Sequence, residues 1–273
     1  MTKMEFASML AEEAKKGGID AEEDYIFRAD GTYIAVILKT EPGIPAPRIP
    51  VDGLFEALES GMPLEKVKAD FVEKAKIANE MTLNGVNEKV LDWGWVKERV
   101  ILRLVPTDRE EVYLAGCVHR MIADLAVVCS ILITEDTATT ATPSLLDAWE
   151  ITEDELFQTA KGKTGPVLSG IEDAIGIAGT GPCGMAVLTS RQLRFGAGAV
   201  LCDGIQEKLD AIYPGGFYLL PSSIHEWLVV GKDNDQDWLK RMVQDTNRTV
   251  LCPEDVLSDN VYTLERGVLK VVC

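Results

Sequence analysis

The sequence predicts an α+β fold: a largely antiparallel sheet with helices packed on one face, preceded by a smaller α+β N-terminal region. Short runs of strand-forming residues follow one another in pairs around turn residues, as in 217–230 and 261–272. Strands and helices do not alternate one for one, as a doubly wound parallel sheet would require. With 47% hydrophobic and 26% charged residues among 273, the chain can bury a sizeable core.

The first part of the chain has the pattern of a small helix-and-hairpin region. Residues 3–16 place Phe6, Met9 and Leu10 at helical spacing before Gly17-Gly18. The runs 25–27 and 33–38 flank Asp30-Gly31, a pair that suits a type I′ hairpin turn. Two further helices are expected, at 52–60 and from Pro63 onward.

A boundary between two regions is expected after the next strand. Val100–Val105 has strand character, and Pro106–Glu111 is the polar segment that best suits a link. We therefore expect an N-terminal α+β region over 1–108 and a C-terminal α+β domain over 109–273.

The start of the C-terminal region combines a buried strand with a well-marked helix. Leu125–Ile133 is rich in β-branched and small apolar residues, which predicts a central strand. Thr152 and Glu155 form a capping-box pattern at the start of a helix over 152–161, and Gly162 is expected to end that helix.

From residue 185 onward, strands and helices are expected in a regular succession. The sequence predicts strands at Met185–Thr189 and Gly196–Cys202, and a helix starting at Asp203. It then predicts a hairpin over 217–230, with Pro221-Ser-Ser223 as its turn. A helix capped by Asp235 and a last hairpin around Arg266-Gly267 complete the chain.

The charge of the chain argues against two classes of partner. With 44 acidic and 27 basic residues, the formal net charge is −17, and the basic clusters are short. Binding to phosphate backbones and to anionic lipid relies on clustered Lys and Arg. We therefore expect neither nucleic-acid nor membrane binding, and another protein is the expected partner.

The N-terminus and the cysteines indicate a cytoplasmic protein. The first residues lack the apolar core of a secretory signal, and the apolar run Met121–Ile133 is too short to cross a bilayer. The six cysteines are scattered without a Cys-x-x-Cys pair, which favours reduced thiols over a disulfide scaffold.

Several site motifs match only in part, so no cofactor and no metal is expected. Gly179–Gly184 spells G-x-G-x-x-G but precedes a strand-like run, and Lys161–Thr164 lacks the earlier glycine of a phosphate loop. Asp233, Asp235 and Asp237 lack the glycine and the glutamate of a calcium loop, so they are interpreted as helix-capping residues. Only two histidines, His119 and His225, are present.

A nucleophilic site is the one catalytic arrangement that the sequence leaves open. Ser222 and Ser223 lie next to His225 and Glu226, and serine or cysteine nucleophiles work with a nearby histidine. The structural alternative is that the serines bond turn backbone while the histidine occupies a half-buried strand position. No Gly-x-Ser-x-Gly elbow is present.

A second polar stretch, 247–262, is the candidate binding patch. The residues marked in it are Asn247, Ser258, Asp259 and Tyr262. These side chains suit the end of one helix and the entry to the last hairpin, or one wall of a groove beside the 221–226 turn.

Pro221–Glu226 and Leu257–Tyr262, together with Asn247, resemble a bacterial family of unknown function. The resemblance extends to Val118-His119, to Asp124–Ala126 and to the Trp149–Glu153 segment. It implies a cytosolic bacterial protein, an accessory protein of mobile genetic elements, and it supplies no catalytic residues.

Two functional hypotheses follow. The first is a non-enzymatic binding or accessory module whose acidic surface engages another protein. The second is a small hydrolase or transferase using His225 with Ser222, Ser223 or a cysteine, which requires a nucleophile within hydrogen-bond reach of the imidazole in an open cleft.

Overall fold

The computed structural model describes residues 1–28, 31–40, 46–83, 85–108, 110–134, 137–171, 184–252 and 255–273. It divides into two compact units, Met1–Asp92 with Glu111–Tyr113, and Trp93–Glu110 with Leu114–Cys273. Strand pairing within the described residues is antiparallel, and helices make up most of the remaining structure, so the predicted α+β class is confirmed. The predicted division of the chain at residues 108 and 109 stays a prediction.

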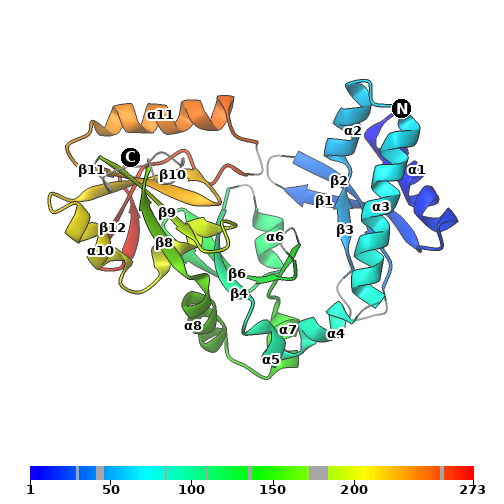
Figure 1. The fold of residues 1–273 in the computed structure, drawn as a ribbon, viewed down its shortest axis with the longest axis horizontal. Coiled ribbons are helices and arrows are strands. Elements are labelled where there is room, and N and C mark those ends of the chain that lie inside the picture. The colour runs from blue at the N-terminus through cyan, green and yellow to red at the C-terminus, as the bar shows by residue number, and fades with distance from the viewer. Residues whose placement is uncertain are drawn as a thin grey trace. The chain divides into compact units, whose positions relative to one another are not determined.

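The N-terminal unit is a three-stranded sheet with helices packed against it (Figure 1). Its strands are β1 (Ala21–Arg28), β2 (Gly31–Leu38) and β3 (Arg48–Pro50), in the order β1-β2-β3. Its helices are α1 (Lys3–Lys16), α2 (Asp52–Glu59), α3 (Leu64–Leu83) and α4 (Val86–Leu91). The predicted helices and hairpin strands are confirmed, while Asp30 of the predicted turn lies outside the described residues.

The helices of this unit form where their sequence signals indicate. Thr2 and Glu5 make a reciprocal capping box at the start of α1, and Gly17 follows its last residue. Phe6, Leu10 and Phe71 are completely buried and form a common core with β2. Each such side chain contributes about 1.5–3 kcal/mol by leaving water.

The C-terminal unit contains a four-stranded sheet whose middle strand is almost wholly buried. Its strands are β4 (Val100–Pro106), β5 (His119–Ile122), β6 (Leu125–Leu132) and β7 (Ala138–Thr140), and β6 pairs with the other three. Every residue of β6 except Leu132 is buried, which confirms the predicted central strand. The helices along this stretch of chain are α5 (Trp93–Val96), α6 (Glu111–Ala115), α7 (Pro143–Trp149) and α8 (Glu153–Thr164).

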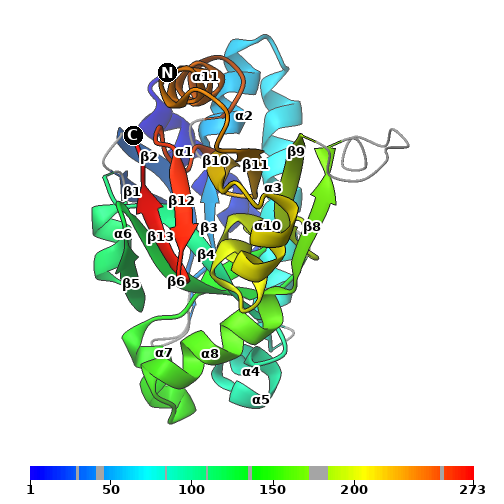
Figure 2. The same cartoon turned by 90° about the vertical axis from the view of Figure 1, so that its left-hand side faces the viewer.

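The same unit contains a six-stranded sheet, in which both predicted C-terminal hairpins are present. Figure 2 shows its strands in the order β13-β12-β10-β11-β9-β8. Their bounds are β8 (Pro166–Gly170), β9 (Met185–Ser190), β10 (Phe217–Ser223), β11 (Glu226–Gly231), β12 (Tyr262–Glu265) and β13 (Val268–Val271).

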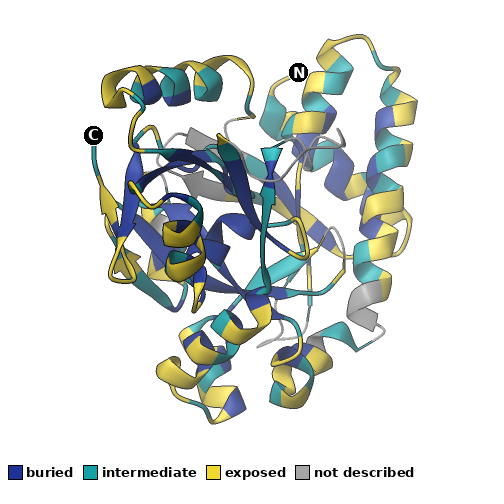
Figure 3. Ribbon diagram, turned by 60° about the vertical axis from the view of Figure 1, so that its left-hand side comes forward, coloured by how far each residue is buried: buried dark blue, intermediate teal, exposed yellow. Residues whose placement is uncertain are grey.

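Helix α11 (Gln236–Thr249) covers one face of this sheet. Asp235 accepts a hydrogen bond from the Trp238 amide at 2.7 Å, so the predicted cap is confirmed. Leu239 and Val243 are buried in a cluster with residues of β10 and β11, while the outer side of α11 is largely exposed (Figure 3).

The prediction of a strand at Gly196–Cys202 is wrong, because this segment forms the short 3-10 helix η1 (Gly196–Leu201). The reason is close backbone packing. A Cβ atom on Gly196 would lie 2.3 Å from the His225 carbonyl oxygen, and one on Gly198 would lie 2.3 Å from that of Leu102. The glycines thus allow η1 to approach two other backbone segments, a long-range constraint that local strand propensity does not contain.

Two predicted helix ends are also wrong. Helix α8 continues past Gly162 to Thr164, whose buried hydroxyl donates to the Ala160 carbonyl and accepts from the Leu102 amide. Gly165, with φ of 59°, is the residue that ends it. Helix α10 (Ile205–Ile212) begins after Gly204, with Asp203 paired instead to Lys161.

The hairpin over 217–230 is present, but its predicted turn is misplaced. Pro221–Ser223 belongs to β10, and the two-residue turn is Ile224-His225. A register shift between Pro221 and Ser223 lets the strand continue through the proline.

Candidate functional site

The imidazole of His225 is held from both sides. Its Nδ1 accepts a hydrogen bond from the Phe195 amide at 3.1 Å, and its Nε2 lies 3.3 Å from Asp255 Oδ1. Because Nδ1 is the acceptor, the proton of the neutral ring lies on Nε2, where it is directed to Asp255. The ring also stacks on that of Phe195, with centroids 6.0 Å apart.

The two candidate serines bond other groups than this ring. Ser222 Oγ donates to Glu226 Oε1 at 3.1 Å, and Ser223 Oγ accepts the backbone N–H of His225 at 3.0 Å. The structure therefore brings Ser222 together with Glu226, and Ser223 together with the turn backbone. Within the described part of the chain, neither serine hydroxyl has a hydrogen bond to the imidazole, and the catalytic role of these four residues stays a prediction.

The candidate binding patch is assembled by hydrogen bonds. Asn247 Nδ2 donates to the Ser258 carbonyl at 3.0 Å and to Asp259 Oδ1 at 2.8 Å. Ser258 Oγ lies 2.7 Å from the hydroxyl of Tyr262. Tyr262 itself is fully buried and packs edge-on against Trp227, whereas Asp259 is exposed and Asn247 and Ser258 are half-buried.

Asp124 and Asn260, which were not predicted from the sequence as binding residues, complete this patch. Asp124 accepts hydrogen bonds from the Tyr262 hydroxyl and from Asn260 Nδ2, both at 2.8 Å. Asp124 lies in the turn between β5 and β6, where Ala123 has φ of 53°. One feature of the sequence could have identified Asp124: it is the single carboxylate within the longest apolar run, Met121–Ile133. Burial raises the pKa of Tyr262, so its hydroxyl stays a proton donor to Asp124.

The two candidate segments meet at Asp255. The Ile224 amide donates to the Asp255 carbonyl oxygen at 2.8 Å, and the Asp255 carboxylate faces the His225 ring. The turn between β10 and β11 is thus connected to the segment that follows α11.

The buried thiols are poor nucleophiles. Burial raises the pKa of Cys129, and it raises the pKa of Cys202 to about 11. Because the thiolate is the reactive form, both are unreactive near neutral pH. Cys183 lies outside the described residues.

The partial motifs give no ligand site in the described residues. Asp235 caps α11, as interpreted from the sequence. Gly179–Cys183 lies outside the described residues, and the residues after Gly184 form strand β9. Among the side chains that the structure describes, no group of three or more His, Cys, Asp or Glu could hold a metal ion. No described helix is both long and apolar enough to cross a membrane.

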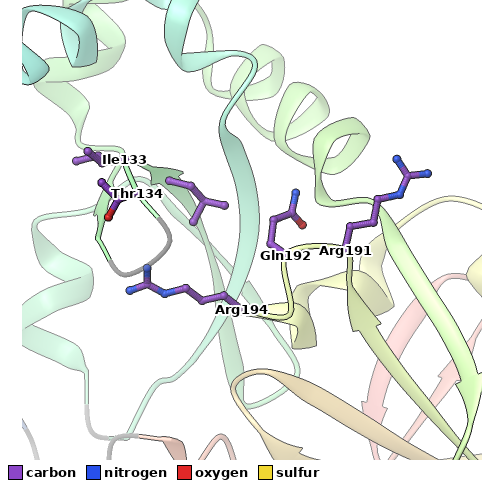
Figure 4. Close-up of a pocket in the computed structure, with 6 residues that line it drawn as sticks. Ile133, Thr134, Arg191, Gln192 and Arg194 are labelled. Atoms are coloured by element: carbon purple, nitrogen blue, oxygen red, sulfur yellow. The ribbon is translucent and has the colours of Figure 1, made fainter. Parts of the chain in front are cut away.

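A pocket of about 500 Å³ lies between the end of β6 and the loop that follows β9 (Figure 4). It is lined by Leu132, Ile133, Thr134, Arg191, Gln192 and Arg194. None of the candidate residues chosen from the sequence lines it.

Comparison with known proteins identifies a family and no function. The model of a family of unknown function, DUF5688, matches residues 5–266. The chain belongs to this family. No curated protein matches the chain. No solved structure matches it either. The predicted resemblance to a family of unknown function is confirmed, and DUF5688 membership assigns no activity to any residue.

Proposed function

We propose that this DUF5688 protein is a non-enzymatic binding or accessory module of the bacterial cytosol, serving mobile genetic elements, whose acidic surface engages another protein. The environment of His225 is the observation that favours binding over catalysis. Its Nδ1 accepts from Phe195 and its Nε2 faces Asp255, so both ring nitrogens have a partner, and the hydroxyls of Ser222 and Ser223 bond other groups than the ring. This geometry supports a binding role.

The outer side of α11 is the surface that best suits a protein partner. Trp238 is 52% exposed, although large aromatic side chains normally bury most of their area. Leu239 and Val243 anchor the helix on the sheet, so Trp238 is presented on a rigid element. Trp and Arg are the residues most enriched at interface hot spots, and Arg241 lies one turn further along the same helix.

The charge of the chain determines the chemistry of the partner. With a net charge of −17, association is fastest with a partner that has a basic surface. Such binding weakens as salt is added, because the Debye length falls from about 10 Å at 0.1 M to about 3 Å at 1 M ionic strength.

The test compares the chain with its Trp238→Ala variant as immobilised baits in host lysate, followed by affinity measurements on each purified partner. We expect a partner that dissociates at high salt and binds Trp238→Ala about ten-fold or more weakly. Val268→Ala, a 51% exposed apolar residue of β13, is the control and leaves the affinity unchanged. The absence of any protein whose direct binding depends on Trp238 and on salt would contradict the proposal.

The alternative of a hydrolase or transferase rests on the hydrogen bond between Ser222 and Glu226. It requires turnover of ester or phosphoester substrates that is lost in Ser222→Ala and in His225→Asn. Glu226→Gln keeps the shape of the side chain and tests whether the carboxylate is needed. Turnover that all three variants abolish would replace the binding proposal by catalysis.

A further inference from the structure

We propose that His225 is a pH-sensitive switch: protonation of its imidazole breaks the hydrogen bond that holds residues 191–195, here called the pocket loop, to the turn between β10 and β11. The proposal goes beyond the binding of a protein partner and does not rest on it. The pocket loop supplies Arg191, Gln192 and Arg194 to the lining of the pocket (Figure 4), so a change in the loop alters a wall of that pocket.

The switch follows from the group that faces Nδ1 of His225. The Phe195 amide donates a hydrogen bond to this nitrogen at 3.1 Å, so Nδ1 has to keep its lone pair. A protonated imidazole has a proton on each ring nitrogen and accepts no hydrogen bond. The neutral ring therefore holds the Phe195 amide, and the protonated ring presents one N–H group to another. Histidine is the side chain that ordinarily changes its charge between pH 5 and 8.

The other histidine of the chain has the opposite arrangement. Nδ1 of His119 lies 3.0 Å from the carbonyl oxygen of Cys117, and because a carbonyl only accepts, this nitrogen is the donor. Protonation of His119 leaves that bond intact, since the donated proton is present in both charge states. Of the two histidines in the sequence, His225 is the one whose bond requires a neutral ring.

The backbone of His225 is fixed, so the turn does not move away when the ring is protonated. Its N–H donates to Ser223 Oγ at 3.0 Å, and its carbonyl oxygen accepts from the Thr189 hydroxyl at 2.8 Å. Neither of these bonds involves a group that titrates near neutral pH. The effect of protonation is therefore expected at the ring and at the amide that faces it.

The amide that His225 holds belongs to a strained residue. Leu193 and Phe195 each have φ of 53°, a left-handed conformation that residues with a bulky side chain rarely adopt. Such residues persist where surrounding contacts hold them. Phe195 is also buried, so an amide that loses its acceptor there has little access to water. Loss of the bond to His225 is expected to let this end of the pocket loop relax.

The start of the pocket loop is held independently of His225. The Arg191 amide donates to the Gly165 carbonyl at 2.9 Å, and the Ser190 hydroxyl donates to the Arg194 carbonyl at 3.3 Å. These hydroxyl and backbone groups do not change their charge in this pH range. Protonation is thus expected to release the Phe195 end of the loop and not the whole segment.

Carboxylates beside the ring favour its protonated form. Asp255 Oδ1 lies 3.3 Å from Nε2, on the segment that follows α11. Glu226 is the next residue in the chain, and its carboxylate accepts a hydrogen bond from Ser222. Glu254, beside Asp255 in the sequence, lies outside the described residues.

Two guanidinium groups oppose the effect of Asp255. The imidazole stacks on the ring of Phe195, and the guanidinium carbons of Arg103 on β4 and of Arg194 lie 4.3 and 4.8 Å from the centroid of that ring. Positive charges nearby disfavour a further positive charge. These groups influence the pH at which the ring is protonated, whereas the loss of the Phe195 bond follows from the protonation itself.

The experiment measures hydrogen exchange of the Phe195 amide in the full chain by NMR at pH 7.5 and pH 5.5. Labelling with 15N-phenylalanine limits the spectrum to seven amides, and correction for the intrinsic exchange rate gives a protection factor at each pH. We expect the protection of Phe195 to fall about ten-fold or more at pH 5.5, because its acceptor is lost. Phe157, inside α8 of the same unit, is the internal reference and should change by less than about two-fold.

Two histidine variants assign the effect. His225→Asn places an amide oxygen close to the position of Nδ1, and this oxygen accepts a hydrogen bond without taking up a proton in this range. Protection of Phe195 should then be the same at both pH values. His119→Asn is the matched control and should keep the fall seen in the wild type. Asp255→Asn removes the charge that favours the protonated ring, so the fall should require a lower pH in that variant.

Each measurement has an outcome that contradicts the switch. Equal protection of Phe195 at both pH values in the wild type would overturn the proposal, as would a fall that persists in His225→Asn or disappears in His119→Asn. A parallel fall at Phe157 would show unfolding of the unit instead of a local change. If His225→Asn does not fold, an unchanged transition pH in Asp255→Asn would count against His225 as the titrating group.

Discussion

The hydroxyl of Tyr262 donates a hydrogen bond to the carboxylate of Asp124, 138 residues earlier in the sequence, at 2.8 Å. Asn260 donates to the other oxygen of the same carboxylate at the same distance. Asp124 lies in the turn between β5 and β6, whereas Tyr262 begins β12. One carboxylate therefore joins the four-stranded sheet to the six-stranded sheet within the C-terminal unit, and both of its oxygens are used.

Removing the Tyr262 hydroxyl is expected to destabilise this junction. Tyr262→Phe keeps the ring against Trp227 but leaves Asp124 Oδ1 without its donor in a partly buried place. A buried acceptor that loses its partner costs about 1–3 kcal/mol. Urea unfolding followed by circular dichroism measures the change. Val268→Ala, at a 51% exposed residue of β13, is the control and should change the stability by less than about 0.5 kcal/mol.

A double-mutant cycle tests whether the two residues act as a pair. Asp124→Ala alone removes the carboxylate that accepts from the Tyr262 hydroxyl and leaves Ser258 Oγ as the remaining partner of that hydroxyl, so the second substitution should cost less once the first is present. We expect an interaction free energy of about 0.5–3 kcal/mol. Strictly additive losses would contradict the pairing.

The stability of the protein should also fall at alkaline pH because of Tyr262. Burial raises the pKa of this tyrosine above its unfolded value of about 10, so the folded state keeps a proton that the unfolded state releases. Its contribution is fully present below pH 10 and is lost as the pH rises further. Unfolding free energies measured between pH 8 and about 11.5 should fall less steeply in Tyr262→Phe than in the wild type. Parallel slopes would show that another group causes the loss.

Two glycines provide a matched pair of opposite effects. A Cβ atom on Gly198 would lie 2.3 Å from the Leu102 carbonyl oxygen, a backbone atom that cannot easily move. Gly198→Ala should therefore cost about 3 kcal/mol or more. Gly162 lies inside α8 with nothing within 4 Å of the added atom, so Gly162→Ala should stabilise the protein by about 0.5–1 kcal/mol. Chemical denaturation of both variants measures whether each substitution raises or lowers the free energy of unfolding. Equal effects would argue against the tight approach of η1 to β4.

The sequence was sufficient where local chemistry decides the structure. Asp235 caps α11, and Arg266-Gly267 forms a turn with φ of 53° and 74°, because each signal acts within a few residues. The sequence was not sufficient where contacts with backbone segments far along the chain determine the local structure. The segment 196–201 has apolar strand-like composition but packs against the His225 and Leu102 carbonyls through its glycines. Strand propensity contains no information about such neighbours.

In the candidate site, too, some features follow from neighbouring residues in the sequence and others depend on distant segments. Ser222, Ser223, His225 and Glu226 lie at one turn because they are consecutive or nearly so in the chain, and their catalytic role stays a prediction. The directions of their side chains depend on the bulge at Pro221 and on Phe195 and Asp255, which come from other segments. Likewise, Asp124 joins Tyr262 only after two sheets have formed, so spacing alone could not select it.

The thiols of the described residues should react with a disulfide reagent at very different rates. Cys252 is exposed, whereas burial raises the pKa of Cys129 and raises the pKa of Cys202 to about 11. Cys202 also donates a hydrogen bond to the Lys161 carbonyl. In a Cys183→Ser background, which removes the thiol outside the described residues, we expect a fast phase at pH 7.5 whose amplitude Cys252→Ser reduces by one thiol, while the partly exposed Cys117 and Cys273 account for the rest of the reaction in the folded state. Cys129 and Cys202 should react only after denaturation, because the reactive thiolate and access by the reagent are both suppressed in the folded state. Rapid modification of Cys129 in the folded protein would contradict the complete burial of β6 at that position.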